Sequence, residues 1–373
     1  MAINNEQNKL NVPHLRFPEF HGEWEKCKLG DIAEFSSARV SSAKLDCKNY
    51  VSTENMLQDF QGVIVAKSVP NETNVISFTC GDILISNIRP YLKKVWKATF
   101  DGGCSSDVFV LHATDTVAKD YLHYAVANDK FINYVMSGAK GVKMPRGDKN
   151  QMRTYQLSLP SIQEQHKIAK ILTLLDERIA TQSKLIEKLE SLIKGLRVSL
   201  MQIENGNIVH LGKIARIYQP QTISSTELTE DGFLVYGANG IIGKYKQYNH
   251  KTEQICITCR GNTCGMVNYT KPMSWITGNA MVINTDEHQN KVCKRYLYHY
   301  LSAYNFNSII SGSGQPQIVR TPLEKLEITL PSIFEQEQKA ILLDRIQTKI
   351  EISNRVLSLY QEQKQYLLRQ MFI

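Results

Sequence analysis

The most chemically suggestive stretch of the sequence is GAKGVKMPRGDKNQMR, which runs from Gly138 to Arg153. It carries five Lys and Arg side chains against a single acid, Asp148. Three glycines and a proline should keep it from forming a regular helix. Its cations would then be free to reach phosphate oxygens or a guanine edge. The predicted nucleic-acid contacts are Lys140, Lys143, Arg146 and Lys149, and a solvated loop that touches nothing is the open alternative.

A second loop, SGSGQPQIVRT from Ser311 to Thr321, occupies the matching place 171 positions later and offers mostly amides. Gln can pair bidentately with adenine and Arg with guanine, so this loop suits a different base sequence. Its candidates are Gln315, Gln317 and Arg320. Further candidates follow two short apolar strands, where exposed solubilising roles are equally open: Arg89, Lys93, Lys94, Arg260 and Asn262.

Two other patterns imitate chemical sites. GANGIIGKY at Gly237 resembles a phosphate-binding loop, but Ala238 replaces the first glycine and Tyr245 the Ser/Thr that would hold magnesium. A Gly-rich turn between strands is the simpler interpretation. Cys256 and Cys259 form one CxxC pair, whereas zinc usually takes two. They alternate with isoleucines as in a half-buried strand, so we expect core residues, no metal site and no catalytic set.

These candidates belong to a duplicated chain. LPSIQEQHKIAKILTLLDERI begins at Leu159, and LPSIFEQEQKAILLDRIQTKI begins at Leu330. LGDIA at Leu29 recurs as LGKIA at Leu211, and ILIS (83–86) recurs as ICIT (255–258). The offset shrinks along the chain, so the second copy is shorter, mostly through a loss opposite residues 55–83. Surface loops tolerate such a change.

Each copy predicts mixed strands followed by one long helix. In the first copy we expect strands within 61–69, 81–88 and 107–113, and one helix over 120–136. The predicted fold class is α+β, with two similar mixed α/β globes separated by two long antiparallel helices under pseudo-twofold symmetry. Residues 1–158 and 203–329 would be the globes, and residues 159–202 and 330–373 the helices.

The long helices have a recognisable start and a recognisable seam. Ser161 with Glu164, and Ser332 with Glu335, form S-x-x-E capping boxes. Downstream, a 3.5-residue apolar period predicts a coiled coil. The predicted seam residues are Ile168, Leu172, Leu175, Ile179, Gln182, Ile186, Leu189, Ile193, Leu343, Ile346, Ile350, Ser353, Leu357 and Tyr360.

The seam needs a partner. Two helices related by a pseudo-twofold axis must run antiparallel if they pack on each other. Gln182 and Ser353, the polar members at the same slot, would then meet on the axis. A 37-residue helix is about 55 Å long and could serve as a spacer. The alternative is two separate helices, each packed on its own globe.

Composition sets outer limits. The 373 residues suffice for two domains, and a net charge of +8 points weakly to a polyanion. No basic tail exists, so a nucleic-acid footprint must arise by folding. No apolar run reaches the roughly 18 residues of a membrane span, and the first twenty residues lack a signal-peptide core. We therefore expect a cytoplasmic protein with its 8 cysteines reduced.

Two divergent halves, each closed by LPS-x-x-EQ and a long heptad helix, resemble the specificity subunit of type I restriction-modification enzymes. The segment NVPHLRFPEFHGEWEKCKLGDIAEF, from Asn11, is also similar, and the resemblance covers essentially the whole chain. It implies that each globe is a target recognition domain that reads one half of a bipartite, asymmetric DNA sequence. The paired helices would set the unread spacer.

The resemblance also implies a non-catalytic subunit that acts in DNA methylation and in host defence against foreign DNA. Its expected partners are double-stranded DNA, two adenine-N6 methyltransferase subunits and two ATP-driven restriction subunits. S-adenosylmethionine, ATP and Mg are expected on those partners, and no cofactor on this chain.

The alternative function is a self-sufficient DNA methyltransferase with duplicated recognition domains. That enzyme would need a D/N/S-P-P-Y/F segment, and the chain has no Pro-Pro; SNIRPY at Ser86 is only an echo. A third possibility is a helical scaffold without affinity for DNA.

Overall fold

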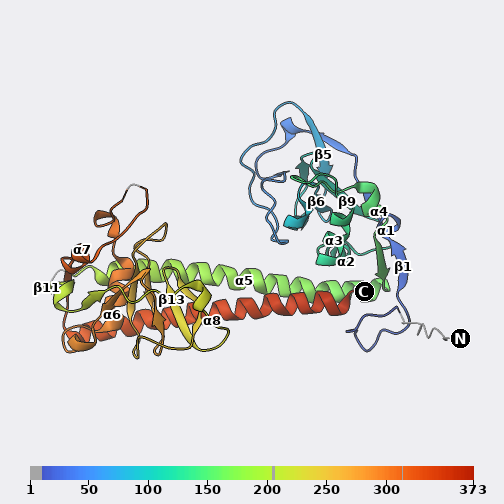
Figure 1. Cartoon of the computed structure of the whole chain (residues 1–373). Coiled ribbons are helices and arrows are strands. Elements are labelled where there is room, and N and C mark those ends of the chain that lie inside the picture. Colours follow the sequence, from blue (N-terminus) through green and yellow to red (C-terminus); the bar gives the residue numbers. More distant parts are fainter. Residues whose placement is uncertain (1–10, 204–205, 313) are drawn as a thin grey trace. The chain divides into compact units, whose positions relative to one another are not determined.

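The computed structural model describes residues 11–203, 206–312 and 314–373, and these divide into two compact bodies. The first body comprises residues 11–182 with Leu357–Ile373, and the second comprises Ser183–Val356. Each body holds one globe and part of each long helix, α5 (Ile162–Met201) and α8 (Ile333–Met371) (Figure 1). The predicted α+β class with an internal duplication is confirmed.

The first body is built on a four-stranded antiparallel sheet in the order β2-β9-β6-β7. Its strands are β2 (Ala33–Phe35), β6 (Ile83–Ser86), β7 (Val95–Lys97) and β9 (Val108–Ala113). Its short helices are α1 (Leu29–Ile32), α2 (Lys119–Val126), α3 (Asp129–Ser137) and α4 (Lys149–Arg153). The inward faces of β6 and β9 pack against α2 and α3 in one apolar core.

Two further sheets, one of two strands and one of four, complete the first body. Strands β1 (Glu25–Lys28) and β10 (Gln156–Leu159) pair antiparallel, so the globe closes next to the start of α5. The other sheet has the order β3-β5-β8-β4, in which β4 and β8 are parallel. Its strands are β3 (Arg39–Ser41), β4 (Tyr50–Val51), β5 (Asn74–Phe78) and β8 (Gly102–Cys104).

The second body repeats this plan. Its main sheet has the order β12-β18-β15-β16, and β11 pairs with β19 as β1 pairs with β10. These strands are β11 (Asn207–His210), β12 (Arg216–Tyr218), β15 (Ile255–Thr258), β16 (Val267–Tyr269), β18 (Ala280–Asn284) and β19 (Glu327–Leu330). Helix α6 (Lys294–Ala303) takes the place of α2, and α7 (Arg320–Glu324) that of α4.

The bodies diverge in their second sheets. The parallel pair β13 (Phe233–Gly237) and β17 (Trp275–Ile276) matches the parallel pair β4 and β8. In the second body the third strand is β14 (Gly240–Tyr245), which forms a hairpin with β13. The segment that imitated a phosphate-binding loop is therefore the turn and second strand of a hairpin. In the first body the third strand is β5, which lies within the predicted insertion and pairs with β8, the other strand of the parallel pair.

Two local predictions for the first copy are wrong. Residues 61–69 form a loop with one isolated bridge, between Met56 and Val63, because the buried Asn55 amide donates to the carbonyls of Tyr50 (3.1 Å) and Ile64 (2.8 Å) and holds the segment away from a ladder. The helix expected over 120–136 is two helices, since the Asn128 side chain accepts from the amide of Phe131 and starts α3.

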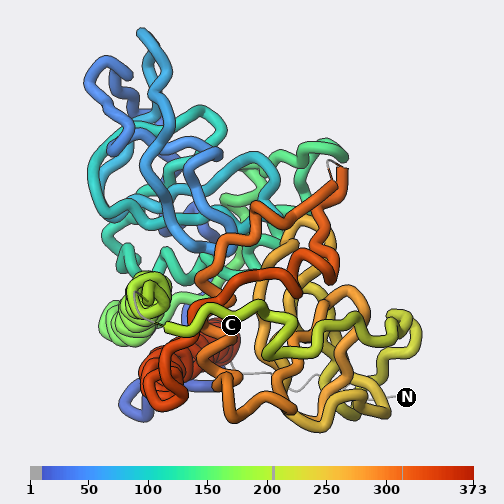
Figure 2. Tube along the Cα trace, turned by 90° about the vertical axis from the view of Figure 1, so that its left-hand side faces the viewer, coloured from blue at the N-terminus to red at the C-terminus, as the bar shows by residue number. Residues whose placement is uncertain are grey.

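Within each body, α5 and α8 lie side by side, as Figure 2 shows nearly end-on. In the first body Ile168 and Leu172 share a core with Leu368 and Met371 of α8. In the second, Ile193 packs with Leu343 and Ile350.

Direction and burial of the helix pair agree with the prediction. The Lys339 Nζ atom near the start of α8 donates to the carbonyl of Leu200 near the end of α5, at 2.9 Å, so the pair runs antiparallel. The predicted seam residues are all buried or half-buried. The alternative of helices packed only on their own globes is wrong. Gln182 belongs to the first body and Ser353 to the second, so their meeting stays a prediction.

The two helix starts differ. In α8 the predicted capping box is complete: the Ser332 amide donates to Glu335 at 3.0 Å, and the Glu335 amide donates to the Ser332 hydroxyl at 3.3 Å. In α5 only half of it exists, because the Glu164 carboxylate accepts from Nε and Nη2 of Arg16, both at 2.8 Å. The prediction of two equal boxes is wrong for Ser161 and Glu164.

Candidate nucleic-acid interface

Residues 138–147 of the first body form a defined hairpin. The backbone amides of Lys140 and Arg146 each donate to the other's carbonyl, at 3.0 and 2.9 Å. Gly141 turns the chain at a φ of +96°, a conformation that glycine adopts easily. The basic loop thus presents its side chains from a fixed backbone.

This hairpin is attached to the loop that follows β6. The amide of Arg89 donates to the carbonyl of Pro145 (2.8 Å), and the amide of Gly147 donates to that of Asn87 (3.0 Å). Asn87 in turn donates to the carbonyl of Asp107, at the start of β9 (2.8 Å). The structure therefore brings Arg89 and Arg146, which come from separate parts of the sequence, to one site.

The second body repeats this support bond for bond. Five backbone hydrogen bonds are equivalent. Ser311 and Gln317 exchange two of them, at 2.9 and 2.8 Å. In the other three an amide donates to a carbonyl: Gly261 to Pro316 (3.0 Å), Ile318 to Cys259 (3.0 Å) and Cys259 to Asn279 (3.3 Å). Ser313, within the predicted loop, lies outside the described residues. The two loops thus have the same backbone hydrogen bonding and carry different side chains.

The exposed side chains of the first hairpin are partly held in place. Arg146 is 55% exposed, and its Nη1 atom lies 3.2 Å from a carboxylate oxygen of Asp107. Lys140 is exposed, with its Nζ 3.8 Å from Asp148, and Lys143 is exposed. The pKa of Asp148 is lowered because its carboxylate accepts from the amides of Asn150 and Gln151.

Lys149 behaves differently from the other three cations. It is half-buried, and its Nζ lies 4.9 Å from the centroid of the Phe109 ring, a cation–π contact. It also begins α4, which runs to Arg153, so the expectation that the whole stretch avoids helix is wrong there. Asp148 caps this helix, and that overrides the nearby glycines.

The candidates after β6 separate into two kinds. Arg89 is exposed and adopts a left-handed backbone (φ +51°), where the second body has Gly261 (φ +85°). An arginine kept in such a strained conformation suggests a functional side chain. Lys93 pairs with Asp129 at 2.8 Å, and Lys94 donates to the carbonyl of Thr53 at 2.6 Å. Burial and the neighbouring Arg89 lower the pKa of Lys94. These two lysines attach the loop to α3 and to the segment at Thr53.

In the second body Gln315, Gln317, Arg260 and Asn262 are all exposed. The Arg320 Nε atom donates to Glu324 at 2.7 Å. Arg260, Gln317 and Arg320 line one cavity of about 320 Å³ together with Tyr218, Gln219, Met281, Ile318 and Val319. Tyr218 and Gln219 were not predicted, because only the pairing of β12 with β18 brings them to this loop.

The role of the glutamine in LPS-x-x-EQ was not predicted from the sequence. The buried Gln165 accepts from the amide of Ala118 (2.8 Å), at the start of α2, and donates to the carbonyl of Pro160 (2.9 Å). Gln336 makes the same pair of bonds with Cys293 (2.9 Å) and Pro331 (3.0 Å). The glutamine fastens each long helix to its globe, and its presence in both copies was the available signal.

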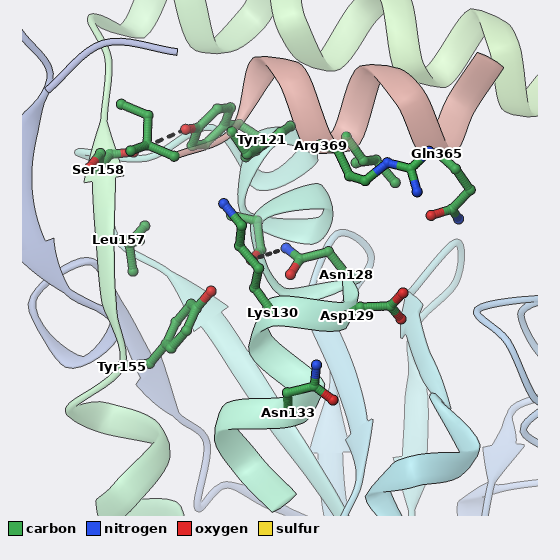
Figure 3. A pocket seen from close by; sticks show the side chains of 14 residues that line it. Tyr121, Asn128, Asp129, Lys130, Asn133, Tyr155, Leu157, Ser158, Gln365 and Arg369 are labelled. Atoms are coloured by element: carbon green, nitrogen blue, oxygen red, sulfur yellow. Dashed lines mark hydrogen bonds between the residues drawn. The ribbon is translucent and has the colours of Figure 1, made fainter. Parts of the chain in front are cut away.

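A second cavity, of about 240 Å³, lies where the end of α8 meets the first globe (Figure 3). Tyr121, Leu157 and Tyr155 form its wall, and the Tyr121 hydroxyl donates to the carbonyl of Ser158 at 3.1 Å. Its polar rim includes Lys130 and Arg369. None of the predicted nucleic-acid contacts lines it, so it is separate from the candidate interface.

The residues that imitated a zinc site belong to the core. Cys256 and Cys259 are 1% and 0% exposed, on and after the central strand β15. Burial raises the pKa of the Cys256 thiol well above its ordinary value. Among the described residues no group of three or more His, Cys, Asp or Glu side chains could hold a metal ion. Every helix in those residues is too short or too polar to cross a bilayer.

Comparisons with known proteins agree with this picture. A family model described as type I restriction modification DNA specificity domain matches residues 21–191 and 204–359. The MjaVIII specificity subunit of Methanocaldococcus jannaschii is 23% identical, over 95% of this chain and 92% of its own length. The EcoprrI specificity subunit of Escherichia coli is 32% identical, over 37% of this chain and 35% of its own length.

Solved structures show the same fold. The crystal structure of a type I restriction-modification S subunit from M. genitalium matches with a TM-score of 0.71 at 16% identity, over 97% of this chain and 99% of that one. A chain from a structure on assembly of the type I R-M system matches with a TM-score of 0.55 at 18% identity, over 92% and 96%. The comparisons support the prediction of a specificity subunit, a non-catalytic component, and give no support to a self-sufficient methyltransferase. The chain belongs to the type I restriction-modification DNA specificity family.

Proposed function

We propose that this chain gives a type I restriction-modification complex its DNA sequence specificity, with each body contacting one half of a bipartite target. One observation carries the proposal: two hairpins with the same backbone support present different polar side chains to solvent. A duplicated fold with different exposed side chains suits two different half-sequences, since base edges are distinguished by donor and acceptor patterns.

The proposed partners are double-stranded DNA, two methyltransferase subunits and two restriction subunits, in the cytoplasm. Base extrusion and methyl transfer would take place on the methyltransferase subunits, which would also bind S-adenosylmethionine; ATP and Mg would bind to partner subunits. This chain would supply recognition and a surface for assembly.

The long helices would set the spacer between the half-sequences. Their heptad seam and antiparallel pairing within each body support this role. Cysteines at 182 and 353 test the predicted register. Disulfide crosslinking in the native protein is the expected result, and failure to crosslink would remove the pseudo-twofold register at that point.

DNA binding is tested with the variants Arg146→Ala and Lys143→Ala. Each should weaken binding, and a variant that loses a phosphate contact should also reduce the slope of log K against log salt by about 0.9. Unchanged affinity and slope in both variants would exclude this hairpin from the footprint.

A gel shift with and without the methyltransferase subunit separates the functions. A specificity subunit should shift a target duplex in the presence of its partner. A scaffold without DNA affinity would add nothing to the partner's own shift. A self-sufficient enzyme would methylate the duplex without the partner, which a methylation assay of the same mixtures detects.

A further inference from the structure

We infer that residue 146 in the first body and residue 317 in the second are equivalent base-reading positions, and that Arg146 selects guanine while Gln317 selects adenine. The inference rests on the proposed function and adds one base identity to each half of the target. It also assigns Asp107 as the positioning residue for Arg146.

Backbone geometry makes the two positions equivalent. Arg146 and Gln317 each exchange two hydrogen bonds across their hairpins, and each follows a proline whose carbonyl accepts from the loop after the central strand. In both bodies the next residue donates to that same loop. Because the main chain is held identically, a difference in what the two positions bind must come from their side chains.

The side-chain chemistry differs in a way that bases can distinguish. Guanine presents two acceptors in the major groove, which suit the forked donors of Arg. Adenine presents one acceptor and one donor, which suit the amide of Gln. Arg146 is 55% exposed and Gln317 is also exposed, so both groups are accessible to a ligand.

The residue at the position of Asp107 also differs between the two bodies. Asp107 contacts Arg146 through Nη1 at 3.2 Å, which orients the guanidinium and leaves other donors for a base. Its equivalent in the second body is Asn279, because the carbonyls of both accept from the matching loop residues Asn87 and Cys259. A carboxylate suits the neighbouring cation of Arg146, whereas the second body has an amide side chain at that position. At these two equivalent positions the first body therefore has Arg and Asp, and the second body has Gln and Asn.

The test uses the full chain assembled with its methyltransferase partner. Genome-wide N6-methyladenine mapping gives the wild-type bipartite motif, and duplexes varied at every motif position give relative affinities. Arg146→Gln should shift one guanine in one half toward adenine, with about tenfold or greater loss of preference for guanine, and leave the other half unchanged. Gln317→Arg should do the reverse in the other half.

Asp107→Asn tests positioning. It should weaken the preference for guanine at the same motif position as Arg146→Gln does, while leaving the midpoint of urea unfolding unchanged. The double variant Asp107→Asn with Arg146→Gln recreates the second body's pair. It should select adenine more sharply than Arg146→Gln alone, an effect that a purely structural role of Asp107 would not produce.

Lys143→Gln, on the same hairpin, is the matched control: it should weaken binding equally for all sequences. If Arg146→Gln and Gln317→Arg also weaken binding uniformly and keep the wild-type motif, both residues contact phosphate and the inference is wrong. If a variant stops methylation, the duplex affinities decide in the same way. A wild-type complex that shows no bipartite motif would instead overturn the proposed function.

Discussion

In the first body the glutamate of LPS-x-x-EQ is buried and paired with Arg16, whereas in the second body Glu335 stays on the surface and caps its own helix. The glutamine that follows has the same two hydrogen bonds in both. The difference arises because Arg16 belongs to a segment preceding β1. The glutamine therefore keeps its role because both globes offer it an equivalent helix start, whereas the role of the glutamate depends on the segment that packs on it.

The largest expected effect is a difference in stability between variants of the two glutamates, Glu164 and Glu335. Glu164→Ala leaves the Arg16 guanidinium, whose side chain is 16% exposed, without its carboxylate partner and should destabilise the first body by about 3 kcal/mol. Glu335→Ala, the matched variant, should have a clearly smaller effect because its carboxylate is in water. Hydrogen exchange measured for each body checks this. Equal losses would mean that the buried ion pair adds nothing beyond capping.

The two glutamines should behave alike. Gln165→Ala removes the partner of the Ala118 amide and of the Pro160 carbonyl, and a buried unpaired group costs about 2 kcal/mol. Gln336→Ala should cost the same in the second body. The amides of Ala118 and Cys293 should lose exchange protection in the respective variants, while the exposed controls Gln163→Ala and Gln338→Ala change neither. If only one of the two variants loses exchange protection at its amide, the two glutamines do not have equivalent roles.

Acid should weaken the second body through His250. Burial lowers the pKa of this histidine from 6.5 to about 4, and its ring is satisfied as neutral imidazole by Tyr218 (2.7 Å) and Asn249 (2.6 Å). The unfolded chain binds a proton below pH 6.5 and the folded chain does not, so stability falls as pH drops from 6.5 toward 4. The loss should reach about 1–2 kcal/mol between pH 7 and 5.

His250→Gln should flatten that pH dependence in the second body, and the exposed His210→Gln should not. Urea unfolding at pH 7 and pH 5, followed by body-resolved hydrogen exchange, measures both. Part of the slope should remain, since burial also lowers the pKa of His299 in this body. The first body keeps its own slope from His123, whose pKa burial lowers to about 4. An unaltered slope in His250→Gln would mean that this ring is protonated in the folded state.

Periodic features were predictable because each depends on neighbouring residues. The seam of α5 and α8, the strands β6 and β9, and the hairpin turn at Gly237 all follow from local patterns. Three features depend on contacts between distant residues and could not be read from a pattern. The strand-like segment 61–69 does not pair in a β-ladder, and Glu164 accepts hydrogen bonds from the distant Arg16. The basic hairpin forms backbone hydrogen bonds with the loop after β6.

The candidate site shows the same limit. Its residue types were identified in the sequence, including Arg146 and Gln317. Asp107, which contacts Arg146, and its equivalent Asn279 were not, because the pairing of β9 with β6 and of β18 with β15 brings them to these loops. The sequence also placed Lys93 and Lys94 with the exposed candidates, whereas Asp129 and the Thr53 carbonyl hold them.

The smallest effect concerns the helix pair itself. Gly195 lies inside α5, in the second body, and a Cβ built there would have no heavy atom within 4 Å. The matching position of α8, in the first body, is Tyr366. Glycine loses more backbone entropy in a helix than alanine does, so Gly195→Ala should stabilise the second body by about 0.5–1 kcal/mol. The midpoint of urea unfolding measures it. Gly261→Ala, at a φ of +85°, should move the midpoint the other way, and a loss in Gly195→Ala would show that α5 gains nothing from a stiffer backbone at this point.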